Sequence, residues 1–334
     1  MKHFLKTIFY FVTPAIVIFL LLLLGYILLD PFKIIYNYED FSKRECGLNR
    51  DYVSTEMLLR NKENHKYNSF IFGSSRALAF RPSSWQKHLK DKDKAFTFDA
   101  SAESIFGIWK KFLFLKENNI KIDNALIVIC RDITFNLDVN HIDFLFLKHP
   151  LVSKESWYRF HYIFLRGYFN KDFLYHYYRY KITNQFDNSM VGYLEKEKYS
   201  IDGITNEMIT TSIEDELKKN EKHYYENRSR IFYPRKGETT DSQIRIKPSQ
   251  KKMLEDILAI LKSDSTNFKV VISPLYDQRK LSPEDKETLQ NLFGDNLYDF
   301  SGCNELTSTY KNYYETSHYR SFIADSILNY IYKK

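Results

Sequence analysis

An uncharged run of 23 residues near the N-terminus, residues 7–29, constrains this chain more than any other feature. As an α-helix rising about 1.5 Å per residue, it would reach roughly 35 Å, enough to cross a bilayer core with some tilt. A buried helix of a globular domain is rarely apolar on every face over such a length. A cleaved signal peptide has a shorter apolar region and small residues at its exit, which residues 26–31 lack. We therefore expect an uncleaved membrane anchor.

The charges beside this run bear on its orientation. Lys2 and Lys6 precede it, while Lys33, Lys43 and Arg44 follow, so the positive-inside rule is nearly balanced. A short N-terminal tail normally stays in the cytoplasm, and no second run of comparable length follows. We expect a single-pass protein of the cell membrane, with residues 1–31 as tail and anchor and residues 32–334 as an extracytoplasmic domain.

Composition excludes several classes of protein. With 44% apolar and 27% charged residues, the chain is neither disordered nor a multi-span membrane protein. Its net charge of +7 is too mild to indicate a nucleic-acid partner. The three cysteines match neither a disulfide framework nor a zinc pattern. We expect no metal and no nucleic acid.

Short apolar segments alternate with helical patterns along most of residues 32–334. Strands are predicted at 69–73, 95–99, 125–130, 268–273 and 297–300, and helices at 104–118, 249–262, 282–293 and 319–332, with a short one after Pro82. Strands separated by helices pair in parallel through right-handed crossovers. The pattern predicts an α/β fold, a three-layer α/β/α sandwich around a mainly parallel five-stranded sheet.

Two regions break this rhythm. Residues 32–68 are mixed and polar, and an insertion at about 148–247 separates the third strand from the fourth. Within the insertion, 151–182 is dense in aromatic residues and predicts one or two helices, whereas 195–247 is polar and loop-like. We interpret the aromatic segment 157–178 as core and membrane-proximal packing in preference to a ligand cage.

Polar residues that follow the strands define the candidate site, because ligands of open parallel sheets bind at the carboxyl ends of the strands. Gly73, Ser74, Ser75 and Arg76 follow the first strand. A serine on such a turn is exposed near the N–H groups of a helix N-terminus. A serine hydroxyl needs a base within hydrogen-bond reach, and that base needs a third group to orient it.

Glu315 and His318, in a loop before the last helix, supply those two roles. Each signal also has a plainer interpretation. Ser75 can be a helix cap or a turn residue, and Glu315 with His318 can be an exposed loop pair. Arg76 can bind an anion or pair with a neighbouring acid, and Asp132 can be a site residue or a helix cap.

The Gly73-Ser74-Ser75-Arg76 turn and the Glu315-x-x-His318 pair resemble the motifs of the SGNH/GDSL hydrolase superfamily, over about residues 69–135 and 265–332. With the N-terminal anchor, they resemble more narrowly the D-alanyl lipoteichoic acid transfer proteins and the partners of membrane-bound O-acyltransferases. The resemblance implies a flavodoxin-like SGNH fold. It also implies a nucleophile at Ser75, a base at His318 and an orienting carboxylate at Glu315.

The chain departs from the family pattern in several places. Ser74 stands where the family has Asp, and Glu315 replaces the Asp of the closing motif. The oxyanion glycine is absent after the second strand, where the N–H groups of Ala100 or Ser101 are the candidate donors. The asparagine expected after the third strand is replaced in Cys130-Arg131-Asp132-Ile133, so Arg131 or Arg76 is the candidate second donor. Losing one such donor typically costs about 2.7–4 kcal/mol of transition-state stabilisation.

These observations predict a membrane-anchored serine ester hydrolase or O-acyltransferase that acts on acyl esters of a cell-surface glycan without a cofactor. The alternative is a non-catalytic SGNH-like protein that binds a glycan or serves as a scaffold for a membrane-bound O-acyltransferase. The two missing oxyanion blocks and the aromatic insertion motivate this alternative. A phosphate or nucleotide site at Gly73 is disfavoured, because no Gly-x-x-x-x-Gly-Lys pattern exists.

Overall fold

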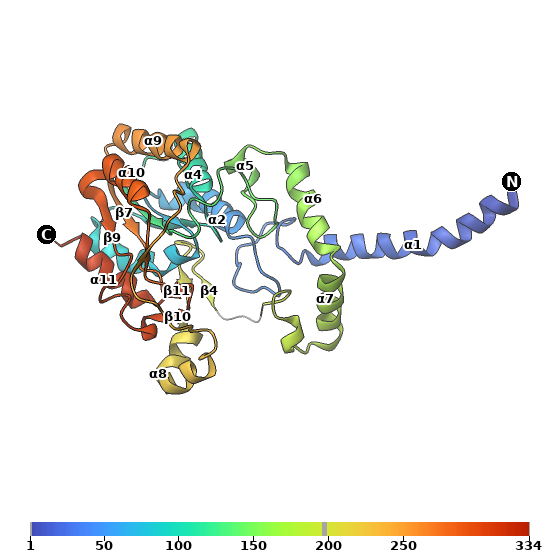
Figure 1. Ribbon diagram of the computed structural model, residues 1–334. Helices are drawn as coiled ribbons and strands as arrows, with labels where there is room; N and C mark the ends of the chain where they lie inside the picture. Colours follow the sequence, from blue (N-terminus) through green and yellow to red (C-terminus); the bar gives the residue numbers. More distant parts are fainter. Residues whose placement is uncertain (1, 196–198, 334) are drawn as a thin grey trace.

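The structure is a computed structural model that describes residues 2–195 and 199–333. A long N-terminal helix projects from an α/β domain built around one sheet (Figure 1). In spatial order the strands of this sheet are β2 (Ala95–Asp99), β1 (Ser69–Gly73), β3 (Asn124–Ile129), β7 (Asn267–Ile272) and β9 (Leu297–Asp299). All neighbouring pairs are parallel. The five predicted strands and their parallel pairing are confirmed, with each strand end within one residue of its expected place.

The order of these strands determines where a ligand site can form. Taken in chain order, the five strands lie in the sequence 2-1-3-4-5, so the direction of winding reverses between β1 and β3. Doubly wound sheets bind their ligands at such a switch point, beyond the carboxyl ends of the strands. The residues that follow β1 and β3 are those of the candidate site.

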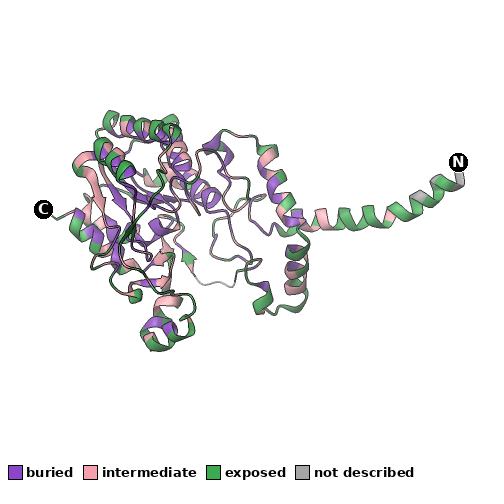
Figure 2. Cartoon of the chain, viewed as in Figure 1, coloured by how far each residue is buried: buried purple, intermediate pink, exposed green. Residues whose placement is uncertain are grey.

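Helices cover both faces of the sheet. Phe70 and Phe72 of β1 join one hydrophobic cluster with helices α2 (Arg50–His65), α4 (Ile105–Glu117), α9 (Pro248–Ser263) and α10 (Pro283–Phe293). Ile71, which points the opposite way, joins a second cluster with η1 (Ser75–Ala79), α3 (Pro82–Trp85) and α11 (Ser321–Ile331). Figure 2 shows the buried residues gathered in the sheet and on the inner sides of these helices.

The N-terminal helix α1 (Lys2–Leu29) is exposed along most of its length (Figure 2). Its part Phe9–Leu29 is long and apolar enough to span a membrane. A signal sequence, which also lies near the N-terminus, can have the same length and composition. Such a surface is unfavourable in water and favourable in lipid. One N-terminal apolar helix was expected, and its length and composition are confirmed.

An aromatic unit lies between α1 and the sheet domain. It contains α6 (Trp157–Tyr168) and α7 (Lys171–Thr183). Phe32, Phe164, Tyr168 and Tyr177 are among its fully buried side chains. The short helix α5 (Pro150–Ser153) precedes α6 and α7 and packs on the sheet domain through Val152.

Two polar regions contain helices that the sequence did not predict. Residues 32–68 include α2, which buries Arg50, Asp51, Ser54 and Thr55 beside Val53, Met57 and Leu58, so polar residues interrupt the apolar pattern that marks a helix. The region 195–247, expected to be loop-like, contains the polar helix α8 (Thr211–Asn227). It also contains the short strands β4 (Ser200–Ile201), β5 (Met208–Ile209) and β6 (Thr239–Thr240), the last paired with β8 (Arg279–Lys280). Residues 196–198 lie outside the described part of this region.

Candidate functional site

The turn after β1 depends on glycine. Gly73 has a φ of +150°, and a Cβ atom on it would lie 2.9 Å from the carbonyl oxygen of Val128 in β3. Only glycine accepts both the backbone angle and the close approach. β1 therefore stops abruptly, and η1 begins two residues later at Ser75.

The two serines of this turn have different environments. Ser74 is the N-cap residue of η1, but its side chain makes no capping hydrogen bond and is buried with Oγ 3.5 Å from Cys130 Sγ. Ser75 is only partly buried. Because Ser74 occupies the cap position, the helix-cap interpretation of Ser75 is wrong.

The side chains of Ser75, His318 and Glu315 contact one another in series. Ser75 Oγ is 2.8 Å from His318 Nε2, and His318 Nδ1 contacts Glu315 Oε1 directly. The His318 side chain is 41% exposed and that of Glu315 33%, so the group is accessible from solvent. This is the arrangement in which an imidazole can accept a serine proton while a carboxylate fixes its tautomer.

A β-hairpin holds the base and the carboxylate, where the sequence indicated a loop. β10 (Tyr313–Glu315) pairs antiparallel with β11 (His318–Tyr319), which sets Glu315 opposite His318. Tyr313 is buried, and its hydroxyl donates to the carbonyl oxygen of Pro274 at 3.1 Å. The hairpin is thus fixed to the segment that follows β7.

Arg76 connects this hairpin to the sheet. Its Nη1 and Nη2 donate to Asp132 Oδ1 and Oδ2 at 2.6 and 2.8 Å, and its Nε donates to the Ser317 carbonyl oxygen at 2.7 Å. The guanidinium is buried, whereas the Asp132 side chain is 35% exposed. Of the two interpretations of Arg76, the ion pair is the one observed. Arg76 and Asp132 position the serine turn and the hairpin relative to each other.

The electrostatics favour an ionised Glu315. Burial by itself disfavours the carboxylate, but three features more than offset it: the hydrogen bond and charge of His318, the Ser317 N–H donor at 2.6 Å and the nearby Arg76. The pKa of Glu315 is therefore lowered from its ordinary value. A carboxylate in this state can accept the Nδ1 proton of His318 and leave Nε2 free to act as a base.

The candidate oxyanion donors are only partly available. The Ala100 N–H donates to the Gly73 carbonyl oxygen at 3.3 Å, which extends the β1–β2 pairing, so Ala100 is engaged elsewhere. Ser101 follows in a turn and is partly exposed. In η1 the first hydrogen bond within the helix runs from the Ala77 N–H to the Ser74 carbonyl oxygen. The Ser75 N–H precedes this donor, so it has no acceptor within the helix. Of the candidate backbone donors, the N–H groups of Ser75 and Ser101 remain.

Arg131 does not serve as the replacement donor that the sequence suggested. Its Nη1 and Nη2 donate to Asp241 at 3.1 Å and to Asp277 at 2.5 Å, and the guanidinium is buried. Arg131 therefore ties the segment after β3 to the segments around β6 and β8. Neither acid is close to Arg131 in sequence, so this pairing had no local signal.

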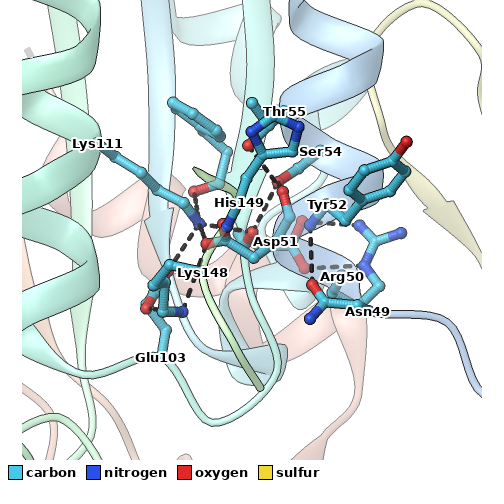
Figure 3. Close-up of polar contacts among 12 residues, drawn as sticks. Asn49, Arg50, Asp51, Tyr52, Ser54, Thr55, Glu103, Lys111, Lys148 and His149 are labelled. Atoms are coloured by element: carbon cyan, nitrogen blue, oxygen red, sulfur yellow. Dashed lines mark hydrogen bonds and ion pairs between the residues drawn. The ribbon is translucent and has the colours of Figure 1, made fainter. Parts of the chain in front are cut away.

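A buried ionic cluster lies beside the carboxyl end of β2. Figure 3 shows Asp51, Glu103, Lys111 and Lys148 pointing toward one another. Lys111 Nζ is 2.6 Å from Glu103 and 3.1 Å from Asp51, and Lys148 Nζ is 2.6 Å from Glu103. All four side chains are at most 1% exposed.

The charges of this cluster balance, with two carboxylates and two ammonium groups. Lys111 also donates to the Asp99 carbonyl oxygen at 2.7 Å, so the cluster holds the end of β2. Gly107 makes room for it, since a Cβ there would lie 1.9 Å from Glu103 Oε1. We assign the cluster a structural role. The sequence signals that could have indicated it are a glycine inside a helix and charged residues at inward-facing positions.

Among the described residues, no three His, Cys, Asp or Glu side chains gather as ligands of a metal ion would. No protein-family model matches the chain, and no curated protein sequence matches it.

Proposed function

We propose that this protein is a membrane-anchored serine ester hydrolase or O-acyltransferase of the SGNH type. The observation that carries the proposal is the contact of 2.8 Å between Ser75 Oγ and His318 Nε2, with His318 Nδ1 on Glu315. The contact lies at the switch point of a parallel sheet, where such sheets bind their ligands. Helices on both faces and the 2-1-3-4-5 order support a three-layer sandwich of the SGNH kind.

In the first half of the proposed reaction, Ser75 Oγ attacks the acyl carbonyl carbon and its proton passes to His318 Nε2. The N–H groups of Ser75 and Ser101 stabilise the negative oxygen of the tetrahedral intermediate. Collapse of this intermediate breaks the ester C–O bond, and the leaving alcohol takes the proton from His318. The acyl group is then esterified to Ser75.

In the second half, a water molecule or an acceptor hydroxyl gives its proton to His318 Nε2 and attacks the acyl-serine carbonyl. The proton returns to Ser75 as the acyl group leaves. Water yields hydrolysis and a sugar hydroxyl yields transfer. Throughout, Glu315 holds the imidazole in one tautomer and stabilises the imidazolium.

The substrate class follows from the anchor and the resemblance. A helix at residues 7–29 would keep the site close to a membrane, and we propose that residues 32–334 lie outside the cytoplasm. An acyl ester of a cell-surface glycan is then the substrate within reach. The acyl donor or acceptor can be supplied by a membrane-bound O-acyltransferase.

The test is covalent labelling of the full chain in detergent with a fluorophosphonate, which reacts with activated serines. We expect labelling of the wild type that is lost in Ser75→Ala and His318→Ala. Ser326→Ala, on the exposed side of α11, is the matched control and keeps full labelling. A folded wild-type chain that takes no label would refute the catalytic proposal and favour the non-catalytic scaffold.

A further inference from the structure

The helices α6 and α7 present a second, outward-facing aromatic surface that the Ser75 site does not use. On α6 it comprises Tyr158 and Tyr162, four residues apart. On α7 it comprises Tyr175 and Ile182, two turns apart. We call these four residues the outer aromatic face. Tyr158 is 90% exposed and Ile182 is 83% exposed, whereas the inner sides of both helices pack into the aromatic unit.

The contacts of α1 show where the turn between α6 and α7 lies. Phe169, in this turn, stacks on Phe19 of α1 with ring centroids 5.3 Å apart. Tyr168, the last residue of α6, packs on Tyr26 with centroids 5.0 Å apart. Phe19 and Tyr26 both belong to the apolar part of α1, Phe9–Leu29. The turn therefore lies beside the apolar part of α1.

The junction between α1 and the two helices is closely packed. The Tyr168 hydroxyl donates to the Leu22 carbonyl oxygen at 2.9 Å. A Cβ atom at Gly25 would lie 2.2 Å from the Tyr178 hydroxyl oxygen. Figure 1 shows α6 and α7 extending to opposite sides of the end of α1 and across its axis. If α1 crosses a bilayer, both helices lie along the membrane surface.

Charge at the turn between the helices fits a lipid surface. Arg166 and Lys171 flank the turn and are exposed, and neither forms an ion pair within the described residues. Of the six basic side chains in residues 154–183, the other four form ion pairs: Lys154, Arg159, Arg179 and Lys181. Exposed tyrosines with flanking cations are typical of membrane-interface segments.

We propose that the outer aromatic face lies in the headgroup region of the membrane that α1 spans, with Arg166 and Lys171 on lipid phosphates. Two in-plane helices and one spanning helix would then fix the height and tilt of the domain. The Ser75 site would sit at a set distance from the bilayer instead of swinging on a flexible tether. The proposal depends on α1 as a membrane span and does not depend on catalysis.

The test uses the full chain reconstituted in vesicles of phosphatidylcholine and phosphatidylglycerol. All variants carry Cys303→Ser, which removes the exposed cysteine. Cys46 and Cys130 stay in place because they are buried. An environment-sensitive fluorophore is attached in Tyr162→Cys or Tyr175→Cys. The matched control is Tyr330→Cys on α11, which has the same exposed fraction as Tyr175, 61%.

With brominated lipids, we expect emission at positions 162 and 175 to fall by about twofold or more, as for groups at the acyl–headgroup boundary. Emission at position 330 stays unchanged. Equal and negligible quenching at all three positions would overturn the proposal. A fluorophore at positions 162 and 175 that is shielded from water in native membranes, but is not quenched in pure lipid vesicles, would also overturn the proposal. That result would assign the face to a protein partner. Fluorophosphonate labelling of the same samples reports separately on the Ser75 site.

Discussion

Ser75 Oγ and His318 Nε2 lie 2.8 Å apart although the two residues are 243 positions apart in the chain. The contact forms because β1 ends at Gly73 and because Arg76, the residue after Ser75, donates to the carbonyl of Ser317, the residue before His318. The same guanidinium is held by Asp132 after β3. Three segments that are distant in sequence thus meet at one buried cation.

Glu315→Gln should lower the rate of fluorophosphonate labelling on the order of 10³–10⁴-fold, because an amide no longer favours the His318 tautomer with a free Nε2. The measurement is the second-order labelling rate of the full chain at neutral pH. Glu287→Gln, at an exposed position on α10, is the control and should label at the wild-type rate. A Glu315→Gln variant that labels as fast as this control would remove Glu315 from the mechanism.

The contribution of Glu315 to stability should depend on pH. Burial by itself raises the folded-state pKa of Glu315, but His318, the Ser317 N–H and Arg76 outweigh this effect and lower the pKa below 4.5. Its stabilising contribution is therefore complete above about pH 4.5 and is lost as the pH falls through the lower folded-state value. The difference in unfolding midpoint between wild type and Glu315→Gln should be constant from pH 7 to about pH 5 and shrink below it. A difference that grew on acidification would contradict this assignment.

Gly73→Ala should destabilise the protein by about 1–3 kcal/mol and abolish serine labelling, because alanine is strained at this backbone angle and its Cβ would meet the Val128 carbonyl. Thermal unfolding and labelling of the full chain measure both effects. Gly203→Ala is the control, since the nearest atom to a Cβ there is 3.9 Å away. Normal labelling by a stable Gly73→Ala variant would show that the tight turn is dispensable.

Lys111→Met should cost about 3–5 kcal/mol of stability, because removing one partner leaves Glu103 and Asp51 buried with reduced compensation. The matched surface variant, Lys252→Met, breaks an exposed pair with Asp256 and should change stability far less than Lys111→Met does. Denaturant unfolding of both variants gives the comparison. Equal effects would mean that the buried cluster is not a determinant of stability.

The five sheet strands and four of the main helices were predictable because each is a continuous stretch with its own hydrophobic pattern. Helices α2 and α8 were not predictable in this way. The first turns of α2 bury Arg50 and Asp51 against partners that come from elsewhere in the chain. α8 is polar and packs mainly through Leu217, Tyr224 and Tyr225. In both cases the apolar stripe that reveals a helix in a sequence is weak.

The candidate site divides in the same way. The anchor-like helix and the strand rhythm depend on residues close together in the chain, so they could be predicted from the sequence. The sheet edge at which Ser75, His318 and Glu315 gather followed from that rhythm, because parallel strands end at a common edge. Three relationships became visible only in the folded chain: Ala100 is engaged by Gly73, Arg131 pairs with Asp241 and Asp277, and Arg76 links the serine turn to the hairpin. Ion pairs form between residues that are close in space but distant in the chain, so the local sequence does not indicate which charges will pair.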